Sequence, residues 1–227
     1  MSLKKRIGLY GGTFDPVHIG HLEIAHRVSE LFELEKVFFV PAQVAPHKLT
    51  RSVTAPLHRY GMLVLATQDY PRLLISTFEL DEPNRRYTVD TVTQLTASFG
   101  TSVELFFIMG ADSWSEIDTW RDWARLLTLT NHIVVTRPAY NVTVDHVSEE
   151  TRKRILDLRG SKEVAGAIRG AVGKNIFFTD VVWQDVSATE IRRVASAGRF
   201  DQLKGLVPEA VAEYIEKYEL YRDLHDA

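Results

Sequence analysis

The segment from Gly11 to His21, GGTFDPVHIGH, combines glycines and histidines in a spacing typical of phosphate binding. Glycine has no Cβ, so its backbone can approach a ligand closely. His18 and His21 lie three residues apart, which places both imidazoles on one side of a helical turn. A protonated histidine at the positive end of a helix dipole is disfavoured unless an anion compensates. The segment therefore predicts an anion site that both histidines face.

The flanking residues place this segment at a strand-to-helix turn. Ile7–Tyr10 is a short apolar run typical of a buried parallel strand, and Ile19–Phe32 carries apolar residues at helical spacing. The first N–H groups of such a helix have no internal partner and attract an anion. A zinc site of His18, His21 and His26 is the alternative, but the sequence has no HExxH pattern and no cysteine. We therefore expect no protein-bound metal here.

Further strand-like runs alternate with helical stretches along the chain. These runs are Lys36–Val40, Leu73–Ser76, Val103–Met109, His132–Thr136 and Asn175–Thr179. The alternation predicts an α/β fold with a doubly wound parallel sheet, in which ligands bind beyond the carboxyl ends of the strands. Several candidate ligand-binding segments directly follow these strands.

Two later regions are read from their polarity and spacing. We predict a helix over Ser148–Leu158, and we interpret the polar stretch Ala139–Lys174 around it as a solvated surface excursion. We also expect a helix over Pro208–Leu224. The sequence leaves open whether this last helix packs within its own chain or against a second copy in a homo-oligomer.

Composition narrows the class of protein. The chain has 227 residues, 45% hydrophobic content, no cysteine and a formal net charge of −3. We predict one domain over residues 1–227, with a helical portion over residues 187–227. The lack of cysteine and of long apolar runs favours a cytoplasmic protein without a membrane partner. The net negative charge argues against bulk nucleic-acid binding.

Four collinear segments together resemble one enzyme family. GGTFDPVHIGH is similar to the (H/T)xGH motif of the nucleotidyltransferase superfamily, and more narrowly to bacterial nicotinate-nucleotide adenylyltransferases. VPAQVAPHK (Val40–Lys48), GADSWSEIDTW (Gly110–Trp120) and VSATEIRR (Val186–Arg193) resemble later motifs of that family. The resemblance implies a Rossmann-like nucleotidyltransferase fold.

The resemblance also implies roles for individual residues. His18, His21, Lys48 and Arg192 would contact the ATP phosphates during the reaction. The other ATP contacts would come from Gly11, Gly12, Thr13, Phe14, Gly110, Asp112, Ser187 and Thr189. The nicotinate nucleotide would meet Thr88, Trp120 and Arg137. Ser187 and Glu190 also form a capping-box pattern, so the last motif is expected to begin a helix as well.

Some positions depart from the family pattern. Glu82, Asn84 and Arg86 replace an expected arginine, glycine and serine, and Ala188 stands where serine is frequent. HIGH (His18–His21) also occurs in class I aminoacyl-tRNA synthetases, but a KMSKS segment is missing.

The chemistry that the resemblance implies is adenylyl transfer from ATP to nicotinate mononucleotide, giving nicotinate adenine dinucleotide and pyrophosphate. Mg²⁺ would bind mainly through the ATP phosphates. Two alternatives remain: adenylation of nicotinamide mononucleotide, and a nucleotide-sensing module without turnover. The histidine pair argues against a sensor, which could bind ATP without groups aimed at the transition state.

Overall fold

The computed structural model describes residues 4–43, 53–81, 87–136, 142–161, 164–180 and 186–222. Within these ranges, seven parallel strands form one sheet in the order β3-β2-β1-β4-β5-β7-β6. The strands are β1 (Lys5–Gly12), β2 (Lys36–Pro41), β3 (Leu73–Ile75), β4 (Val103–Gly110), β5 (Asn131–Val135), β6 (Ile155–Asp157) and β7 (Ile176–Thr179). The predicted doubly wound parallel sheet is confirmed.

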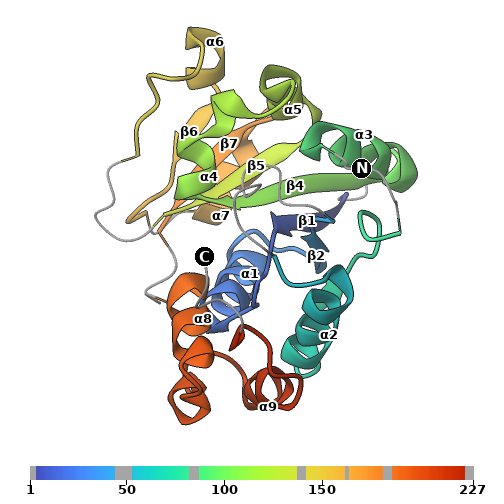
Figure 1. Cartoon of the computed structure of the whole chain (residues 1–227). Coiled ribbons are helices and arrows are strands. Elements are labelled where there is room, and N and C mark those ends of the chain that lie inside the picture. The colour runs from blue at the N-terminus through green and yellow to red at the C-terminus, as the bar shows by residue number, and fades with distance from the viewer. Residues whose placement is uncertain are drawn as a thin grey trace.

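Helices cover both faces of the sheet (Figure 1). The α-helices are α1 (Ile19–Leu31), α2 (Pro56–Thr67), α3 (Thr88–Phe99), α4 (Ala111–Ser115), α5 (Trp123–Leu129), α6 (Glu149–Arg152), α7 (Val164–Gly170), α8 (Ala188–Ser196) and α9 (Glu209–Lys217). Two 3₁₀ turns, η1 (Ile117–Thr119) and η2 (Phe200–Leu203), complete the described helices. None of these helices is long and apolar enough to span a membrane.

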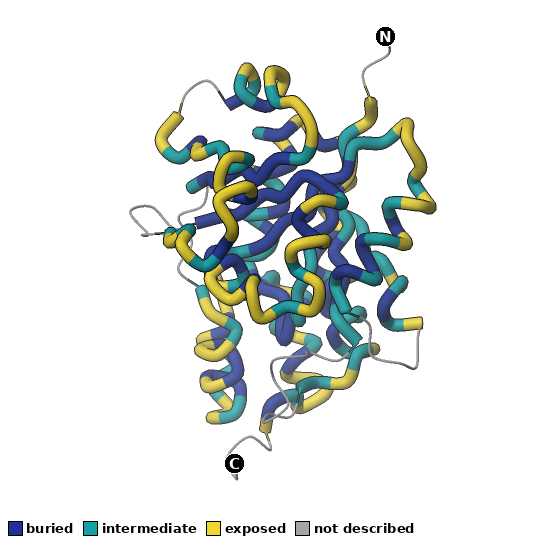
Figure 2. Tube along the Cα trace, turned by 90° about the horizontal axis from the view of Figure 1, so that it is seen from above, coloured by how far each residue is buried: buried dark blue, intermediate teal, exposed yellow. Residues whose placement is uncertain are grey.

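The central strand β4 is buried on both faces, because alternate side chains of a strand point in opposite directions. Leu105 and Phe107 join the core under α3 and α5, whereas Phe106 and Ile108 join the core under α1. Figure 2 shows the buried strands enclosed by helices with exposed outer faces. Burial on both sides explains why residues 105–109 of β4 read as a continuous apolar run.

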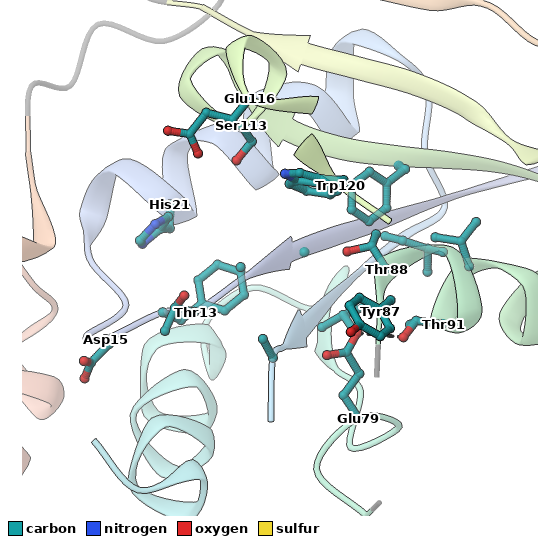
Figure 3. Close-up of a pocket in the computed structure, with 18 of the residues that line it drawn as sticks. Thr13, Asp15, His21, Glu79, Tyr87, Thr88, Thr91, Ser113, Glu116 and Trp120 are labelled. Carbon is teal, nitrogen blue, oxygen red and sulfur yellow. Dashed lines mark hydrogen bonds between the residues drawn. The ribbon is translucent and has the colours of Figure 1, made fainter. Parts of the chain in front are cut away.

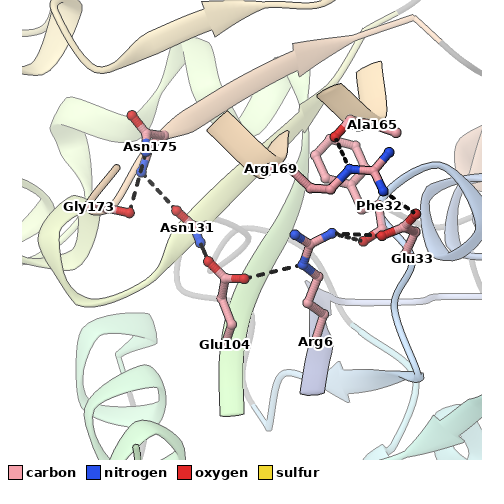
Figure 4. Close-up of polar contacts among 9 residues, drawn as sticks. All are labelled: Arg6, Phe32, Glu33, Glu104, Asn131, Ala165, Arg169, Gly173 and Asn175. Carbon is pink, nitrogen blue, oxygen red and sulfur yellow. Dashed lines mark hydrogen bonds and ion pairs between the residues drawn. The ribbon is translucent and has the colours of Figure 1, made fainter. Parts of the chain in front are cut away.

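Polar contacts connect the amino ends of the central strands (Figure 4). Arg6 donates to Glu104 at 3.3 Å, and Asn131 donates to the same carboxylate at 2.9 Å. The Asn175 N–H in turn donates to the Asn131 side chain at 2.9 Å. This network holds the strand starts in register, while the candidate site lies at the opposite, carboxyl edge.

The region after β5 corrects two sequence-based expectations. The predicted helix over Ser148–Leu158 is wrong, because α6 ends at Arg152 and the chain continues as strand β6. The interpretation of Ala139–Lys174 as a solvated excursion is also wrong for its described part, since β6 pairs with β7. Leu158 and Ile168 are buried there as well. The helix expected over Pro208–Leu224 is shorter than predicted, because α9 ends at Lys217.

Candidate active site

A cavity of about 590 Å³ opens where β1, β2 and β4 end (Figure 3). The predicted site residues that line it are Gly11, Gly12, Thr13, Phe14, His21, Thr88, Trp120 and Arg192. The predicted residues that are described but do not line it are His18, Gly110, Asp112, Ser187 and Thr189. Lys48 and Arg137 lie outside the described residues. The location agrees with the general rule for open parallel sheets.

The glycine pair is needed for packing. Both residues still belong to β1, where Gly11 and Gly12 pair with β2. A Cβ on Gly11 would lie 2.9 Å from Cζ of Phe107, and one on Gly12 would lie 2.8 Å from Cζ of Phe14. Phe14 has a positive φ of 51°, which is uncommon for a bulky residue. Aromatic rings, and not only a ligand, therefore exclude side chains at both glycines.

His18 and His21 form a stacked pair at the start of α1. Their ring centroids lie 3.6 Å apart, and the His18 N–H donates to Nδ1 of His21 at 3.3 Å. A neutral His21 that accepts at Nδ1 carries its hydrogen on Nε2. His18 is only 7% exposed, and burial lowers its pKa to about 4. His18 is therefore neutral at pH 7, and of the two rings it is His21 that lines the cavity.

Arg59 is fully buried and positions three segments around the cavity. Its guanidinium donates to the carbonyls of Thr13 at 2.8 Å, Ala42 at 2.7 Å and Thr54 at 2.9 Å. Burial lowers the pKa of Arg59, and the charge of Asp15 opposes that effect. The sequence analysis did not identify Arg59. Its place on the buried stripe of α2 is the signal that could have found it.

Arg192 connects α8 to the glycine segment, by which we mean residues 11–15. It is 5% exposed, donates to the Asp15 carbonyl, and donates a second hydrogen bond to Thr189 Oγ1 at 2.9 Å. Ser187 caps α8 by accepting from the Glu190 N–H at 3.1 Å. The Glu190 carboxylate accepts hydrogen bonds from Arg193. Of the two hydrogen bonds in the predicted capping box, the structure therefore shows the one that Ser187 accepts. Arg192 thus lines the cavity in a geometry that Thr189 helps to hold.

The other end of the cavity is aromatic. Trp120 stands nearly perpendicular to Phe107, with ring centroids 6.5 Å apart. Figure 3 shows Trp120, Thr88 and Tyr87 at this end, well separated from His21. The Thr91 hydroxyl donates to Glu79 at 2.8 Å beside them. The cavity therefore combines a polar end at the glycine segment with an aromatic end.

The segment that follows β4 contributes different residues from those expected. Gly110 precedes α4 and Asp112 is exposed in its first turn. Neither lines the cavity, whereas Ser113 and Glu116 of the same segment do. Asp15, Glu79 and Arg121 are further lining residues that the sequence analysis did not single out. Their roles depend on contacts between distant segments, which leave no local sequence signal.

Comparisons with known proteins show which family the chain resembles. A family model described as cytidylyltransferase-like matches residues 9–194. A probable nicotinate-nucleotide adenylyltransferase of Thermoanaerobacter sp. (strain X514) is 40% identical over 222 residues, which cover 98% of this chain and 97% of that protein. A relative with the same description from Pseudomonas aeruginosa is 37% identical, covering 97% of this chain and 99% of its own length.

Solved structures support the same architecture. A Plasmodium falciparum nicotinic acid mononucleotide adenylyltransferase complexed with NaAD aligns with a TM-score of 0.71 and 18% identity, covering 96% of this chain and 98% of that one. This alignment, over a seven-stranded parallel sheet, shows a nucleotidyltransferase fold. From the family model and the relatives, the chain belongs to the nicotinate-nucleotide adenylyltransferases, a family of nucleotidyltransferase enzymes.

Proposed function

We propose that the protein transfers the adenylyl group of ATP to nicotinate mononucleotide, giving nicotinate adenine dinucleotide and pyrophosphate. The observation that carries this proposal is a single cavity with His21 and the glycine segment at one end and Trp120 at the other. Such a cavity can hold a triphosphate and a pyridine ring at the same time. The names of the relatives support the same substrates.

The reaction needs positioning more than proton abstraction. The attacking group is the 5′-phosphate of the mononucleotide, whose second pKa is near 6, so it is mostly ionised at neutral pH. The phosphate oxygen attacks the α-phosphorus of ATP while the bond to pyrophosphate breaks. Two polyanions must be held in line while negative charge moves to the leaving group. No general base and no covalent intermediate are required.

The polar end of the cavity offers donors for that charge. Nε2–H of His21 would donate to a phosphate oxygen, because Nδ1 is already occupied by the His18 N–H. Backbone groups of Gly11 to Phe14 and the start of α1 would add neutral donors and the helix dipole. Arg192 would contribute positive charge at the same end, where it donates to the Asp15 carbonyl. His18 would act through its stacking on His21, since it does not line the cavity.

Mg²⁺ would bind mainly through the ATP phosphates, because this ion usually keeps several waters and uses substrate phosphate oxygens. The acidic lining residues fit that arrangement. These are Asp15, Glu79 and Glu116. Asp15 and Glu79 accept hydrogen bonds from Tyr221 and Thr91, and the three carboxylates lie apart in Figure 3. Mg²⁺ would screen the phosphate charge. The described side chains would hold the nucleotides themselves.

One assay tests the proposal. Pyrophosphate release should be measured with ATP and either nicotinate mononucleotide or nicotinamide mononucleotide, each over a range of concentrations. We expect release with the nicotinate substrate and a higher kcat/KM for it than for the amide. A preference for the amide would favour the alternative substrate, and no release with either would favour a nucleotide-sensing module. We place the reaction in the cytoplasm, as the cysteine-free composition suggests.

A further inference from the structure

The aromatic end of the cavity carries an arginine that the proposed chemistry has not yet used. Among the described lining residues, the basic side chains are His21, Arg121 and Arg192. Arg192 belongs to the glycine-segment end, where it donates to Asp15. Arg121 directly follows Trp120 and is exposed, so its charge is available to a ligand in the cavity.

Arg121 is held by an aromatic contact. Its Cζ lies 4.6 Å from the centroid of the Tyr87 ring, which is a cation–π geometry. A guanidinium that lies over an aromatic ring can still donate hydrogen bonds through its N–H groups. Those donors match a carboxylate, which can accept two parallel hydrogen bonds. No ion pair joins Arg121 to a carboxylate within the described residues.

The acidic side chain at the same end does not replace this cation. Glu79 is 9% exposed and accepts a hydrogen bond from Thr91. Arg121 is the basic described side chain that lines this end, beside Trp120 and Tyr87.

We propose that Arg121 is a specificity-determining residue: its guanidinium, which lies over the Tyr87 ring, binds the carboxylate of the pyridine ring held at Trp120, so that the acid is preferred to the amide. This inference rests on the proposed adenylyl transfer. It assigns acid recognition to a side chain.

The test compares both mononucleotides at saturating ATP. For Arg121→Gln, we expect kcat/KM for nicotinate mononucleotide to fall about tenfold, chiefly through KM, while kcat/KM for nicotinamide mononucleotide changes less than twofold. Arg121→Lys should keep part of the kcat/KM for nicotinate mononucleotide, because lysine retains the positive charge but cannot donate two parallel hydrogen bonds to a carboxylate. Arg121→Glu should lower the acid-to-amide ratio further.

Arg125→Gln is the matched control. Arg125 is an exposed arginine on the neighbouring helix α5, pairs with Asp122 at 3.6 Å, and does not line the cavity. Its acid-to-amide ratio should match that of the unmodified protein. Equal losses for both substrates in Arg121→Gln, or an unchanged ratio, would overturn the inference while leaving adenylyl transfer intact. An unmodified protein without pyrophosphate release on either substrate would overturn both.

Discussion

The Tyr221 hydroxyl donates a hydrogen bond of 3.0 Å to Oδ1 of Asp15, although the two residues lie 206 positions apart in the chain. The Asp15 carbonyl also accepts from Arg192, and the Thr54 N–H approaches its other carboxylate oxygen at 3.5 Å. Burial and the nearby charge of Asp15 raise the pKa of Tyr221, so its hydroxyl stays protonated. Tyr221, in the C-terminal region, therefore stabilises the position of Asp15 after the glycine pair.

Replacing Tyr221 by phenylalanine should remove this hydrogen bond to Asp15. We expect Tyr221→Phe to lower the free energy of unfolding by about 1–3 kcal/mol, because the buried Asp15 carboxylate loses a donor. Urea denaturation followed by circular dichroism measures the change. Tyr218→Phe is the control, since Tyr218 is 49% exposed, and it should change stability by less than about 0.5 kcal/mol. Equal effects of the two variants would contradict the role of the buried contact.

Removing the cavity-lining imidazole should reduce turnover. We expect His21→Ala to lower kcat by about 10²–10³, the scale of losing one transition-state donor. Pyrophosphate release at saturating substrates measures the effect, and circular dichroism checks that the fold is retained. His26→Ala serves as the control, because His26 lies on an outer part of α1 near Glu30. A loss of less than tenfold in His21→Ala would refute the assigned role.

Trp120 should matter more for one substrate than for the other. We expect Trp120→Ala to raise KM for the pyridine nucleotide more than KM for ATP, because a stacking surface is lost at the aromatic end. Trp120→Phe should retain part of the affinity, since it keeps an aromatic ring. The two KM values are compared by varying each substrate in turn. Equal increases would indicate that Trp120 only supports the fold.

A buried histidine in β5 should make the protein sensitive to acid. His132 is fully buried. Burial lowers its pKa from 6.5 to about 3. Between those pH values, the His132 imidazole is therefore protonated in the unfolded chain and neutral in the folded chain. The free energy of unfolding should have its full value above pH 6.5 and should fall as the pH decreases toward 3.

The corresponding experiment measures the free energy of unfolding in urea from pH 7 to pH 4. His132→Leu should flatten the decline by about 1.4 kcal/mol per pH unit, the slope for one proton. A shallower residual decline is expected from His18, whose pKa is also lowered, to about 4. Parallel curves for the two proteins would show that His132 is not the source.

The glycine positions give a packing prediction. Gly12→Ala should destabilise the protein by about 1–3 kcal/mol, because the new Cβ would overlap the Phe14 ring. Gly166→Ala is the control, since a Cβ there meets no atom within 4 Å in helix α7. The control should be neutral or stabilising by about 0.5–1 kcal/mol. A harmless Gly12→Ala would show that the Phe14 ring moves aside easily.

The sequence predicted the parts of the fold that have strong periodicity. Ile19–Phe32 matches α1 to within one residue, and Val103–Met109 matches β4 equally well. The sequence also placed Gly11, His21 and Trp120 in what proved to be one cavity. These residues lie close to strand ends, where the topology of a parallel sheet fixes their meeting place.

The remaining features depend on long-range contacts. β6 has only three residues, so no alternating pattern could reveal it after the helix start at Ser148. Arg59 and Asp15 gain their roles from carbonyls and hydroxyls far away in the sequence. Single-sequence patterns report neighbours along the chain, so these positions could not be assigned in advance.

Phe14 and Phe107 crowd the glycine pair. This packing affects how the sequences of active enzymes can be distinguished from those of inactive relatives. A descendant that had lost turnover would still need both glycines to accommodate the two rings. Keeping the pair in a genome sequence therefore reports an intact scaffold and says nothing about activity. The position of His21, whose ring lines the cavity, is the more informative one to inspect.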